Sequence, residues 1–497
     1  MDKYDVIVVG CGPGGAIAGK TAAEKGLKTL ILERGRKPGE KNVSGCGLSP
    51  KCWRDFPFMK ELDLPNMRVA EMATAHFVDK HNKELINMSF SPSESAEYEE
   101  ARKFLTTNVY RSELDPWLAS LAVEMGAELR TSTLATGMLK SDRGKILGII
   151  LEDGTKLSAD VVIGADGIIS TTAISAGLRN RWEAYETGLI IQYDYKATRE
   201  KIDEVIGSNA LHYWYSATFP VAYTFFNANG FHAGLGGFLE WWDKSPLYYL
   251  DTFLQVEGIQ RQIRLTEAKP REYQAHMLPF LSRPGKTYAD NLMLVGDAAG
   301  FACPLEAEGV YYAMLSGKIA AEVGADSISS GDTSELKLVD YEKRWKNSPI
   351  GDEFEAGPEI SNFLRDLAFN PKPGEWITPF LNDVMFGICN VANSHVANWR
   401  DMESELYKYS PYLLDVLLRD FLPIIGAINK PHSKEISRPL KWIGNKFGSF
   451  LLPRIARRIG SQKDLPLDAM RFLIEQFVEP LIEARMDSRY FKERGGK

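Results

Sequence analysis

The sequence has few cysteines and no long hydrophobic run. Its five cysteines are scattered over 497 residues without a CxxC pair, which argues against a disulfide framework and against a zinc or iron–sulfur site, so we expect no bound metal. No uninterrupted apolar stretch reaches the roughly 18 residues of a membrane span. A strand already begins by Tyr4, so we expect no signal peptide. These absences together favour a cytoplasmic protein.

Positive charge is also in deficit. The net charge of −7 argues against nucleic acid as the main partner. The composition, 44% apolar and 25% charged, is typical of a soluble globular protein. A chain of 497 residues is too long for one hydrophobic core, so we expect two or three subregions.

The first forty residues have the order strand, glycine turn, helix. Residues 5–9 are apolar and predict a strand buried on both faces, and residues 16–25 predict a helix. Between them, Gly10 suits a tight bend, Gly12 lets backbone N–H groups approach a pyrophosphate, and Gly15 lets helix and strand pack closely. The helix directs its N-terminal N–H groups at the phosphates. This order predicts a dinucleotide site.

A second apolar strand, residues 27–32, follows and ends at Glu33. An acid at this distance from the glycines can accept a hydrogen bond from a ribose hydroxyl. Two alternatives stay open: a glycine-rich turn that binds no nucleotide, and a solvated carboxylate at a strand end. The arrival of strand, glycines, helix, strand and acid in order favours the nucleotide.

Two later segments repeat the pattern of a buried strand that breaks into a glycine turn. Residues 159–167 end at Asp166 and Gly167, and residues 291–300 contain Gly296 and Asp297. A carboxylate at a strand end, followed by small residues, can accept hydrogen bonds from ribityl or ribose hydroxyls. The alternative for Asp297 is a helix N-cap.

Arg111 stands just before a predicted helix whose N-cap would be Ser112. Its guanidinium carries several N–H donors, so it can bind the cofactor phosphates or the acid at the end of the second strand. The alternative is an arginine exposed on the surface.

Weak alternation over residues 67–98 indicates strands that leave the nucleotide core. Residues 184–289 alternate strongly and are rich in aromatics, which predicts an antiparallel sheet. Its aromatic face either covers an apolar ligand or packs into a core.

The segments GCGPGG…E, ADVVIGADG and NLMLVGDAAG, in this order and spacing, resemble the FAD-binding fold of the p-hydroxybenzoate-hydroxylase-like flavoproteins. Within that superfamily the chain is similar to the branch of geranylgeranyl reductases, FixC flavoproteins and electron-transfer-flavoprotein:quinone oxidoreductases, over most of residues 1–350. The resemblance implies an α/β fold. Its Rossmann-like FAD-binding domain would span 1–180 and 287–330, its antiparallel substrate domain 181–286, and a helical C-terminal region 331–497.

The same resemblance assigns residues to FAD and to its surroundings. The flavin N5 would carry the chemistry, and no catalytic side chain is assigned. The cofactor-binding residues would be Gly10, Gly12, Gly14, Gly15, Glu33, Arg34, Ser44, Gly45, Arg111, Asp166, Gly167, Gly296, Asp297 and Gly309. Candidates beside the flavin are Ser44, Cys46, Tyr223 and Cys303. Cys46 and Cys303 suit either a redox pair or ordinary apolar packing.

Motifs within the branch point in two directions. Residues 41–45 (KNVSG), 111–118 and 272–276 (EYQAH) are similar to FixC proteins, and Ser44 replaces the cysteine usual in archaeal geranylgeranyl reductases. Residues 222–225 and 307–309 resemble those reductases instead. We therefore expect FixC-like transfer of electrons from an electron-transfer flavoprotein or ferredoxin-like carrier to a quinone or an iron–sulfur partner. The alternatives are a polyprenyl reductase that saturates C=C bonds and a flavin-bearing assembly subunit without catalysis.

Residues 429–463 are strongly basic, with nine lysines and arginines against one acid, Glu435, and with interleaved aromatic and aliphatic residues. Such a segment suits the interface of an anionic membrane, which predicts peripheral contact with the inner face of the cell membrane. Docking of an acidic protein is the alternative.

Overall fold

The computed structural model describes residues 2–40, 46–79, 81–94, 96, 98–216, 218–280, 284–303 and 308–355. All of them belong to Met1–Glu435, the larger of two compact units into which the chain divides. Beyond residue 330 the described helices are α10 (Glu335–Lys346) and α11 (Pro349–Glu355). The rest of the predicted helical C-terminal region, with the basic segment 429–463, lies outside the described residues.

An eight-stranded sheet forms the first layer of this mixed α/β fold. Its main path runs β17-β18-β11-β1-β2-β8, and β10 pairs with β11 and β9. The five strands β18, β11, β1, β2 and β8 are parallel neighbours. The bounds are β1 (Lys3–Val9), β2 (Thr29–Leu32), β8 (Glu128–Arg130), β9 (Ala135–Lys140), β10 (Ile146–Leu151), β11 (Lys156–Gly164), β17 (Tyr288–Ala289) and β18 (Leu292–Leu294).

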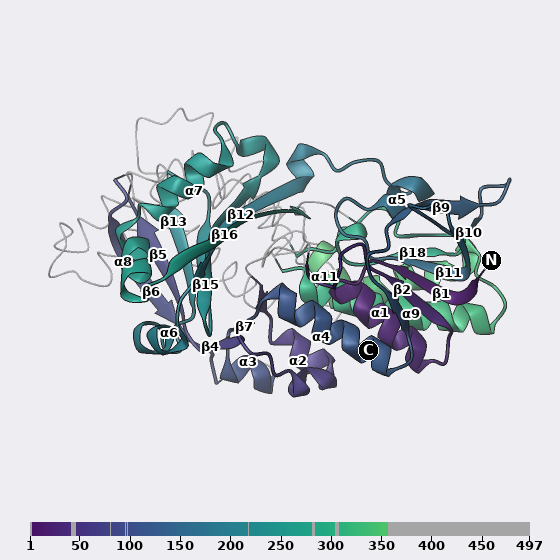
Figure 1. Ribbon diagram of the computed structural model, residues 1–497, viewed down its shortest axis with the longest axis horizontal. Helices are drawn as coiled ribbons and strands as arrows, with labels where there is room; N and C mark the ends of the chain where they lie inside the picture. Colours follow the sequence, from purple (N-terminus) through teal and green to yellow (C-terminus); the bar gives the residue numbers. More distant parts are fainter. Residues whose placement is uncertain are drawn as a thin grey trace, which may run out of the picture. The chain divides into compact units, whose positions relative to one another are not determined.

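Both faces of the parallel strands are buried, which is why those strands are apolar runs without alternation. The helix α1 (Pro13–Glu24) packs against α9 (Val310–Ser329) and α4 (Arg111–Glu124) (Figure 1). The crossing of α1 and α9 is close: a Cβ on Gly317 would lie 2.2 Å from the carbonyl oxygen of Gly14. The glycines of these helices therefore set how tightly the layer packs.

A seven-stranded sheet, in the order β16-β12-β15-β14-β13-β5-β6, forms the second layer. All neighbours are antiparallel except β13 and β5. Its bounds are β5 (Ala73–Val78), β6 (Glu84–Phe90), β12 (Thr187–Lys196), β13 (Leu211–Ser216), β14 (Ala222–Asn227), β15 (Gly230–Phe238) and β16 (Lys269–Pro279). As the weak alternation over 67–98 indicated, β5 and β6 leave the nucleotide sheet, so residues within 1–180 complete a sheet built mainly from 181–286.

Helices cover one face of this second sheet. They are α6 (Arg199–Val205), α7 (Pro246–Leu254) and α8 (Glu257–Leu265) (Figure 1). The side chains of Trp214, Phe226 and Phe231 are fully buried in the same core as Phe253 of α7 and Ile259 of α8. These helices leave the opposite face of the sheet uncovered, and residues of that face line the cavity described below.

A three-stranded sheet joins the two layers. It has the order β3-β7-β4, with β3 (Gly47–Leu48), β4 (Arg68–Ala70) and β7 (Thr106–Asn108). Asn108, fully buried in β7, donates from Nδ2 to the carbonyl oxygens of Ala210 (2.8 Å) and Phe226 (2.9 Å) in the second layer. The short helices α2 (Lys51–Asp55), α3 (Glu99–Lys103) and α5 (Thr171–Ala176), and the 3-10 turns η1 (Pro57–Glu61), η2 (Ala184–Glu186), η3 (Leu239–Trp241) and η4 (Gly296–Ala298), complete the described elements.

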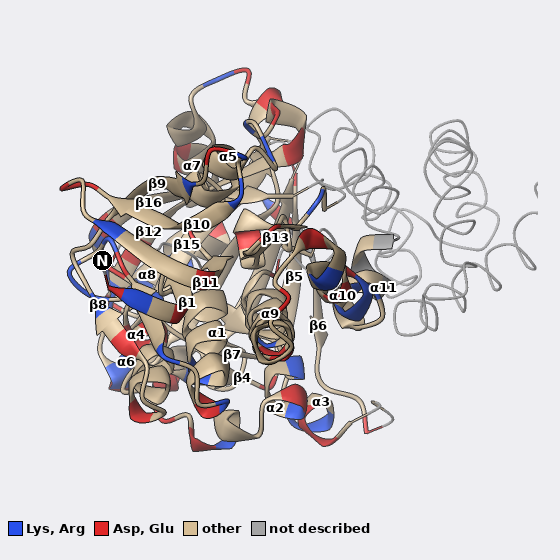
Figure 2. Cartoon of the chain, turned by 90° about the vertical axis from the view of Figure 1, so that its right-hand side faces the viewer, with Lys and Arg blue, Asp and Glu red and all other residues tan. Residues whose placement is uncertain are grey.

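Charged residues of both signs are interspersed over the face drawn in Figure 2, for example on α2, α3 and α10. Among the described residues, no helix combines the length and the apolar character needed to cross a bilayer.

Candidate functional site

One large cavity lies at the carboxyl ends of the parallel strands and reaches the free face of the second sheet. Its volume is about 1140 Å³, above the roughly 300–1,000 Å³ of most small-molecule sites. It is lined by the turn after β1, the end of β2, the loop after β11, η4 after β18 and the start of α9. Residues of β12, β13, β14, β15 and β16 line its other side. A cavity of this size has room for a dinucleotide and for a second molecule.

The glycine turn after β1 has the close approaches that a pyrophosphate site needs. Gly10 has φ +100°, and a Cβ there would lie 2.3 Å from the carbonyl oxygen of Ala165. A Cβ on Gly15 would lie 1.9 Å from the carbonyl oxygen of Gly10, so helix and turn meet as the sequence predicted. Gly12 and Gly14 line the cavity at the N-terminus of α1. Backbone N–H groups there suit a phosphate.

Glu33 lines the cavity at the end of β2 and is 9% exposed. Its carboxylate accepts from the backbone N–H of Cys11 (3.1 Å) and of Gly35 (2.6 Å). These bonds hold the carboxylate between the glycine turn and the following loop, so it is not a solvated strand end. Arg34 lines the cavity next to it.

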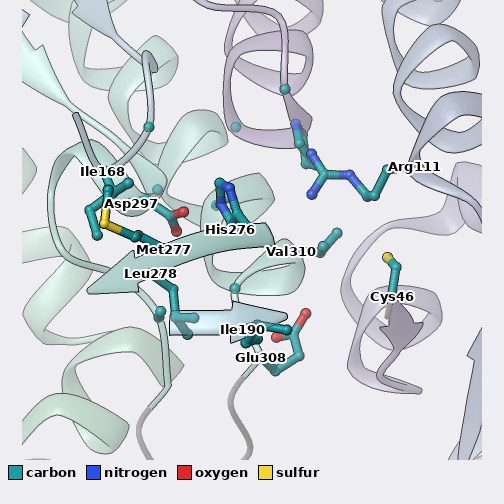
Figure 3. A pocket seen from close by; sticks show the side chains of 18 of the residues that line it. Cys46, Arg111, Ile168, Ile190, His276, Met277, Leu278, Asp297, Glu308 and Val310 are labelled. Carbon is teal, nitrogen blue, oxygen red and sulfur yellow. The ribbon is translucent and has the colours of Figure 1, made fainter. Parts of the chain in front are cut away.

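Arg111 is neither a surface arginine nor, in this structure, bonded to the acid of the second strand. It forms a bidentate pair with Asp115 one turn along α4, from Nε at 2.6 Å and Nη2 at 2.7 Å. Burial alone would lower the pKa of Arg111, but the charge of Asp115 outweighs it and the pKa is raised. Figure 3 shows the guanidinium extending into the cavity toward His276. The ion pair with Asp115 thus keeps the guanidinium of Arg111 protonated and in place at the cavity wall.

Asp297 and His276 approach the cavity from opposite layers (Figure 3). Burial raises the pKa of Asp297 to about 6, partly offset by the charge of Arg111. Burial, with the positive charges of Arg111 and Arg34, lowers the pKa of His276 to about 4, so its imidazole is neutral near neutral pH. In the sequence, His276 is distinguished only as the last residue of the segment 272–276. Residues 275–278 of β16 all line the cavity, so the alternation of this strand alone does not single out His276.

Asp166 lines the cavity with Gly167 and Gly296, but its carboxylate is engaged by α5. It accepts from the backbone N–H of Thr172 (2.9 Å), from the Thr172 hydroxyl (2.6 Å) and from the Ser170 hydroxyl. Burial raises the pKa of Asp166 although these hydrogen bonds oppose the shift. Asp166 therefore orders the loop that borders the cofactor end of the cavity.

The free face of the second sheet supplies an apolar surface, which we call the aromatic wall: Leu211, Tyr213, Tyr215, Val221, Tyr223 and Phe225. The Tyr223 hydroxyl donates to Oε1 of Gln192 at 2.6 Å, and burial raises the pKa of Tyr223, so the phenol stays neutral. One face of the sheet thus packs into a core with the helices, whereas the other lines the cavity, where the covering of an apolar ligand stays a prediction.

The two cysteines expected beside the flavin differ in position. Cys46 lines the cavity and is 7% exposed. Cys303 is fully buried, is not among the lining residues, and its backbone pairs with Glu308. That bridge turns the chain toward Gly309, which lines the cavity before α9. Residues 44 and 45 lie outside the described residues.

Comparisons with known proteins agree with this geometry. The family described as "FAD binding domain" matches residues 3–240. A digeranylgeranylglycerophospholipid reductase of Methanocaldococcus jannaschii is 31% identical over 347 residues, which are 69% of this chain and 83% of that protein. Protein FixC of Bradyrhizobium diazoefficiens is 28% identical over 369 residues, 70% of this chain and 81% of that protein.

Among solved structures, a geranylgeranyl bacteriochlorophyll reductase-like protein of Thermoplasma acidophilum has the same fold. Its TM-score is 0.65 at 22% identity, and the match covers 84% of this chain and 99% of that one. The fold and the cavity define an FAD-dependent oxidoreductase of the p-hydroxybenzoate-hydroxylase-like type. The chain belongs to the geranylgeranyl reductase family of these flavoproteins, as the resemblance implied, and its cofactor is FAD.

Proposed function

We propose that this protein is a prenyl reductase, which saturates C=C bonds of an isoprenoid chain with electrons taken from FAD. The observation that carries the proposal is the continuity of one cavity from the glycine turn to the aromatic wall. A quinone ring alone would need less apolar surface than this wall presents. The reductase of Methanocaldococcus jannaschii, more similar to this chain than FixC is, favours this alternative over the FixC-like function expected from the sequence.

In this proposal the residues of the chain would bind FAD, orient the isoprenoid and exclude water from the cavity. The glycine turn and the start of α1 would hold the pyrophosphate, and Arg111, which is paired with Asp115, would offer its positive charge to the cofactor from the cavity wall. When bound, FAD supplies two-electron transfer at N5. Saturation of one C=C bond takes these two electrons and two protons. The aromatic wall stays uncharged because Tyr223 keeps its proton, and it would hold the isoprenoid chain out of water.

The test is anaerobic reoxidation of the reduced protein. Dithionite-reduced protein, freed of excess reductant, is mixed with a geranylgeranyl lipid or with a quinone, and flavin absorbance is followed. We expect reoxidation by the lipid, with saturated product found by mass spectrometry. Fast reoxidation by quinone without alkene reduction would overturn the proposal in favour of FixC-like electron transfer. Reoxidation by neither would favour an assembly subunit.

A variant pair tests the aromatic wall. Val221→Asp places a charge on the half-buried edge of the wall, whereas Leu336→Asp places one on a side chain that is 88% exposed. We expect the first to weaken the lipid reaction strongly and the second to leave it unchanged, with FAD retained in both. Equal effects of the two would contradict the assignment of the wall.

We also propose peripheral contact with the membrane through residues 429–463, and reduction of FAD by an electron-transfer flavoprotein or a ferredoxin-like protein. The support is the basic and aromatic composition of that segment and the chemistry of the family's cofactor. Co-sedimentation with anionic and neutral liposomes tests the first, and indifference to anionic lipid would exclude it. Stopped-flow mixing with each reduced carrier tests the second.

A further inference from the structure

Two loops that line the cavity begin at the ends of neighbouring strands. η4 follows β18 and carries Asp297, and the loop after β11 lines the cavity with Gly167 and Ile168. The strands β11 and β18 are parallel neighbours, and their pairing reaches Gly164 and Leu294. Both loops lie beyond that pairing, so contacts outside the sheet must set the distance between them.

Arg179 is bonded to the end of η4. Its guanidinium donates from Nη1 to the carbonyl oxygen of Ala298 (2.8 Å) and from Nη2 to the carbonyl oxygen of Ala299 (3.2 Å). These two residues directly follow Asp297 in the chain, so the bonds fix the backbone that carries the Asp297 carboxylate. Arg179 is not among the described residues that line the cavity. It therefore acts on the site through η4.

Trp182 is bonded to the other loop and packs on Arg179. Its Nε1 donates to the carbonyl oxygen of Ile168 at 2.9 Å. The guanidinium carbon of Arg179 lies 3.6 Å from the centroid of the Trp182 ring, and stacking of a guanidinium on an indole is favourable. Arg179 and Trp182 thus form one unit, which we call the clamp, and each of its side chains holds one loop.

The charge of Arg179 is not matched by an ion pair. Within the described part of the chain no carboxylate is paired with it, and Glu186 acts on it only as a more distant charge. Burial lowers the pKa of Arg179 to about 10, so the guanidinium stays protonated at neutral pH. Partial burial of a cation without a paired carboxylate is unfavourable by itself. The hydrogen bonds to η4 and the stacking on Trp182 are the contacts that offset it.

The clamp lies on the linker between the two large sheets. Residues 177–186 connect α5, which follows β11, to β12. Within this linker η2 has a reciprocal capping box between Glu183 and Glu186. The carbonyl oxygen of Glu186 accepts from the backbone N–H of Phe280 at 2.9 Å, just after β16. Residues 188–190 of β12 then line the cavity, so the clamp joins both loops to the segment from which the second sheet starts.

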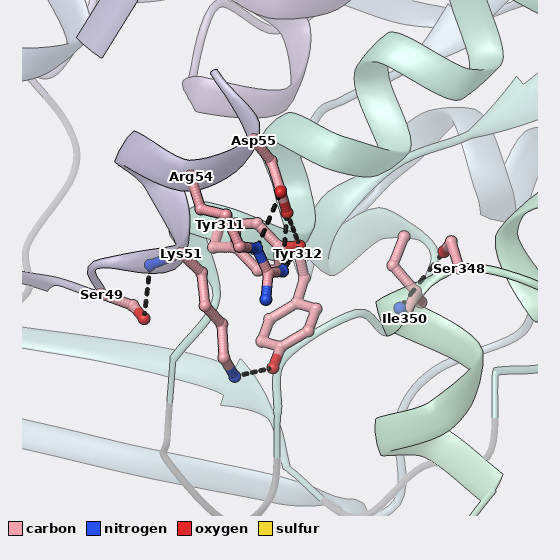
Figure 4. Close-up of polar contacts among 8 residues, drawn as sticks. All are labelled: Ser49, Lys51, Arg54, Asp55, Tyr311, Tyr312, Ser348 and Ile350. Carbon is pink, nitrogen blue, oxygen red and sulfur yellow. Dashed lines mark hydrogen bonds and ion pairs between the residues drawn. The ribbon is translucent and has the colours of Figure 1, made fainter. Parts of the chain in front are cut away.

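The start of α9, which also borders the cavity, has anchors of its own (Figure 4). The Tyr311 hydroxyl donates to the carboxylate of Asp55 and accepts from Arg54 at 3.1 Å. The Nζ of Lys51 lies 3.0 Å from the hydroxyl of Tyr312. These bonds tie α9 to α2, so the clamp acts on η4 and on the loop after β11 rather than on the whole cofactor end of the cavity.

We propose that Arg179 and Trp182 are positioning residues for FAD, and that the clamp holds η4 and the loop after β11 at the spacing that receives the cofactor. FAD then meets loops that are already ordered, so less of its binding free energy is used to order them. The clamp acts on the cofactor, and its role is therefore the same for an isoprenoid and for a quinone substrate.

Retention of FAD by the full-length holoprotein tests the clamp without turnover. The holoprotein is diluted in steps, free FAD is measured in the ultrafiltrate, and the dissociation constant follows. Arg179→Met removes both bonds to η4, and Trp182→Phe keeps an aromatic ring beside the guanidinium but removes the donor to Ile168. We expect each variant to bind FAD about tenfold more weakly, because FAD must then order one loop itself. Arg179→Lys, which keeps a donor for one carbonyl oxygen, should recover most of the affinity.

A double-mutant cycle separates a clamp from two independent contacts. If the two side chains act as one unit, Arg179→Met with Trp182→Phe weakens FAD binding by less than the product of the two single effects. Circular dichroism of the bound flavin is the second readout, and we expect it to change in both single variants because the loops around the cofactor move. Should Arg179→Met fail to fold, Arg179→Lys replaces it in the cycle, with a smaller effect of the same sign.

Arg181→Met is the matched control. Arg181 lies two residues along the same linker, is exposed, and forms no hydrogen bond or ion pair within the described part of the chain, so we expect FAD binding within about twofold of the unaltered protein. Three results would overturn the clamp: unchanged affinity and flavin dichroism in both single variants, single effects that multiply in the double variant, and an equal loss in Arg181→Met. None of these measurements depends on which substrate the protein reduces.

Discussion

The replacement of Gly15 by alanine is the most direct test of the cofactor site. The added Cβ would lie 1.9 Å from the carbonyl oxygen of Gly10 and 3.0 Å from its carbonyl carbon. Both are backbone atoms, so no change of rotamer relieves the contact. To reach an ordinary contact near 3.4 Å, α1 must move away from the turn by more than about 1 Å. The same movement displaces the N–H groups that face the phosphates.

We expect Gly15→Ala to lower the free energy of unfolding by about 3 kcal/mol, the upper part of the range for overpacked sites, because the clash is between backbone segments. We also expect most of the FAD to be lost during purification. The assay is urea denaturation together with the ratio of flavin to protein absorbance. Gly137→Ala is the control: its Cβ meets nothing within 4 Å, and we expect unfolding free energy within about 1 kcal/mol of the unaltered protein.

Gly15→Ala protein with full FAD content and unaltered stability would refute the reasoning, since it would mean that helix and turn do not meet as described. Instability in both variants would show instead that alanine is poorly tolerated anywhere in this sheet and its turns. The pair thus separates close packing from general sensitivity.

Three further predictions follow from buried polar groups. Because the folded pKa of Asp297, about 6, lies above its ordinary value of 3.8, stability is lost as pH rises between these values, so Asp297→Asn should raise the melting temperature of apo-protein more at about pH 8 than at about pH 4. Asp115→Ala leaves Arg111 uncompensated and should cost about 3–5 kcal/mol in denaturant unfolding. Tyr223→Phe leaves Oε1 of the buried Gln192 without its donor and should cost about 1–3 kcal/mol, with slower lipid reduction in the reoxidation assay.

Local sequence predicted the parts of the site that depend on neighbours in the chain. The roles of Gly10 and Gly15 follow from one strand, one turn and one helix, and the structure has both close approaches. The pair of Arg111 with Asp115 is also local, at a spacing of four residues on a helix, but an arginine at the start of a helix suits a cofactor phosphate as well as a carboxylate one turn along. The pair does not exclude a contact with the cofactor, because Arg111 also lines the cavity, so that contact stays a prediction.

Non-local placement was harder to predict. The position of His276 depends on β16 pairing with β12, and the exclusion of Cys303 from the cavity depends on its bridge to Glu308. The two-residue alternation of the aromatic strands shows that each strand has two different faces. It does not show which face packs against helices and which faces the cavity, because that depends on the order of the strands in the sheet.

The order of the strands also explains why one cavity has a polar end and an apolar end. The polar end is lined by backbone N–H groups and charged side chains at the ends of the parallel strands, which suit a nucleotide, and the apolar end is lined mainly by side chains of the antiparallel layer. Asn108 links the two ends of the cavity. Its amide nitrogen donates to the carbonyl oxygens of Ala210 and Phe226 in the second layer, and its own strand, β7, pairs with β3, which follows Cys46. A change at this buried amide would shift the aromatic wall relative to the cofactor end of the cavity, although Asn108 is not itself among the residues that line it.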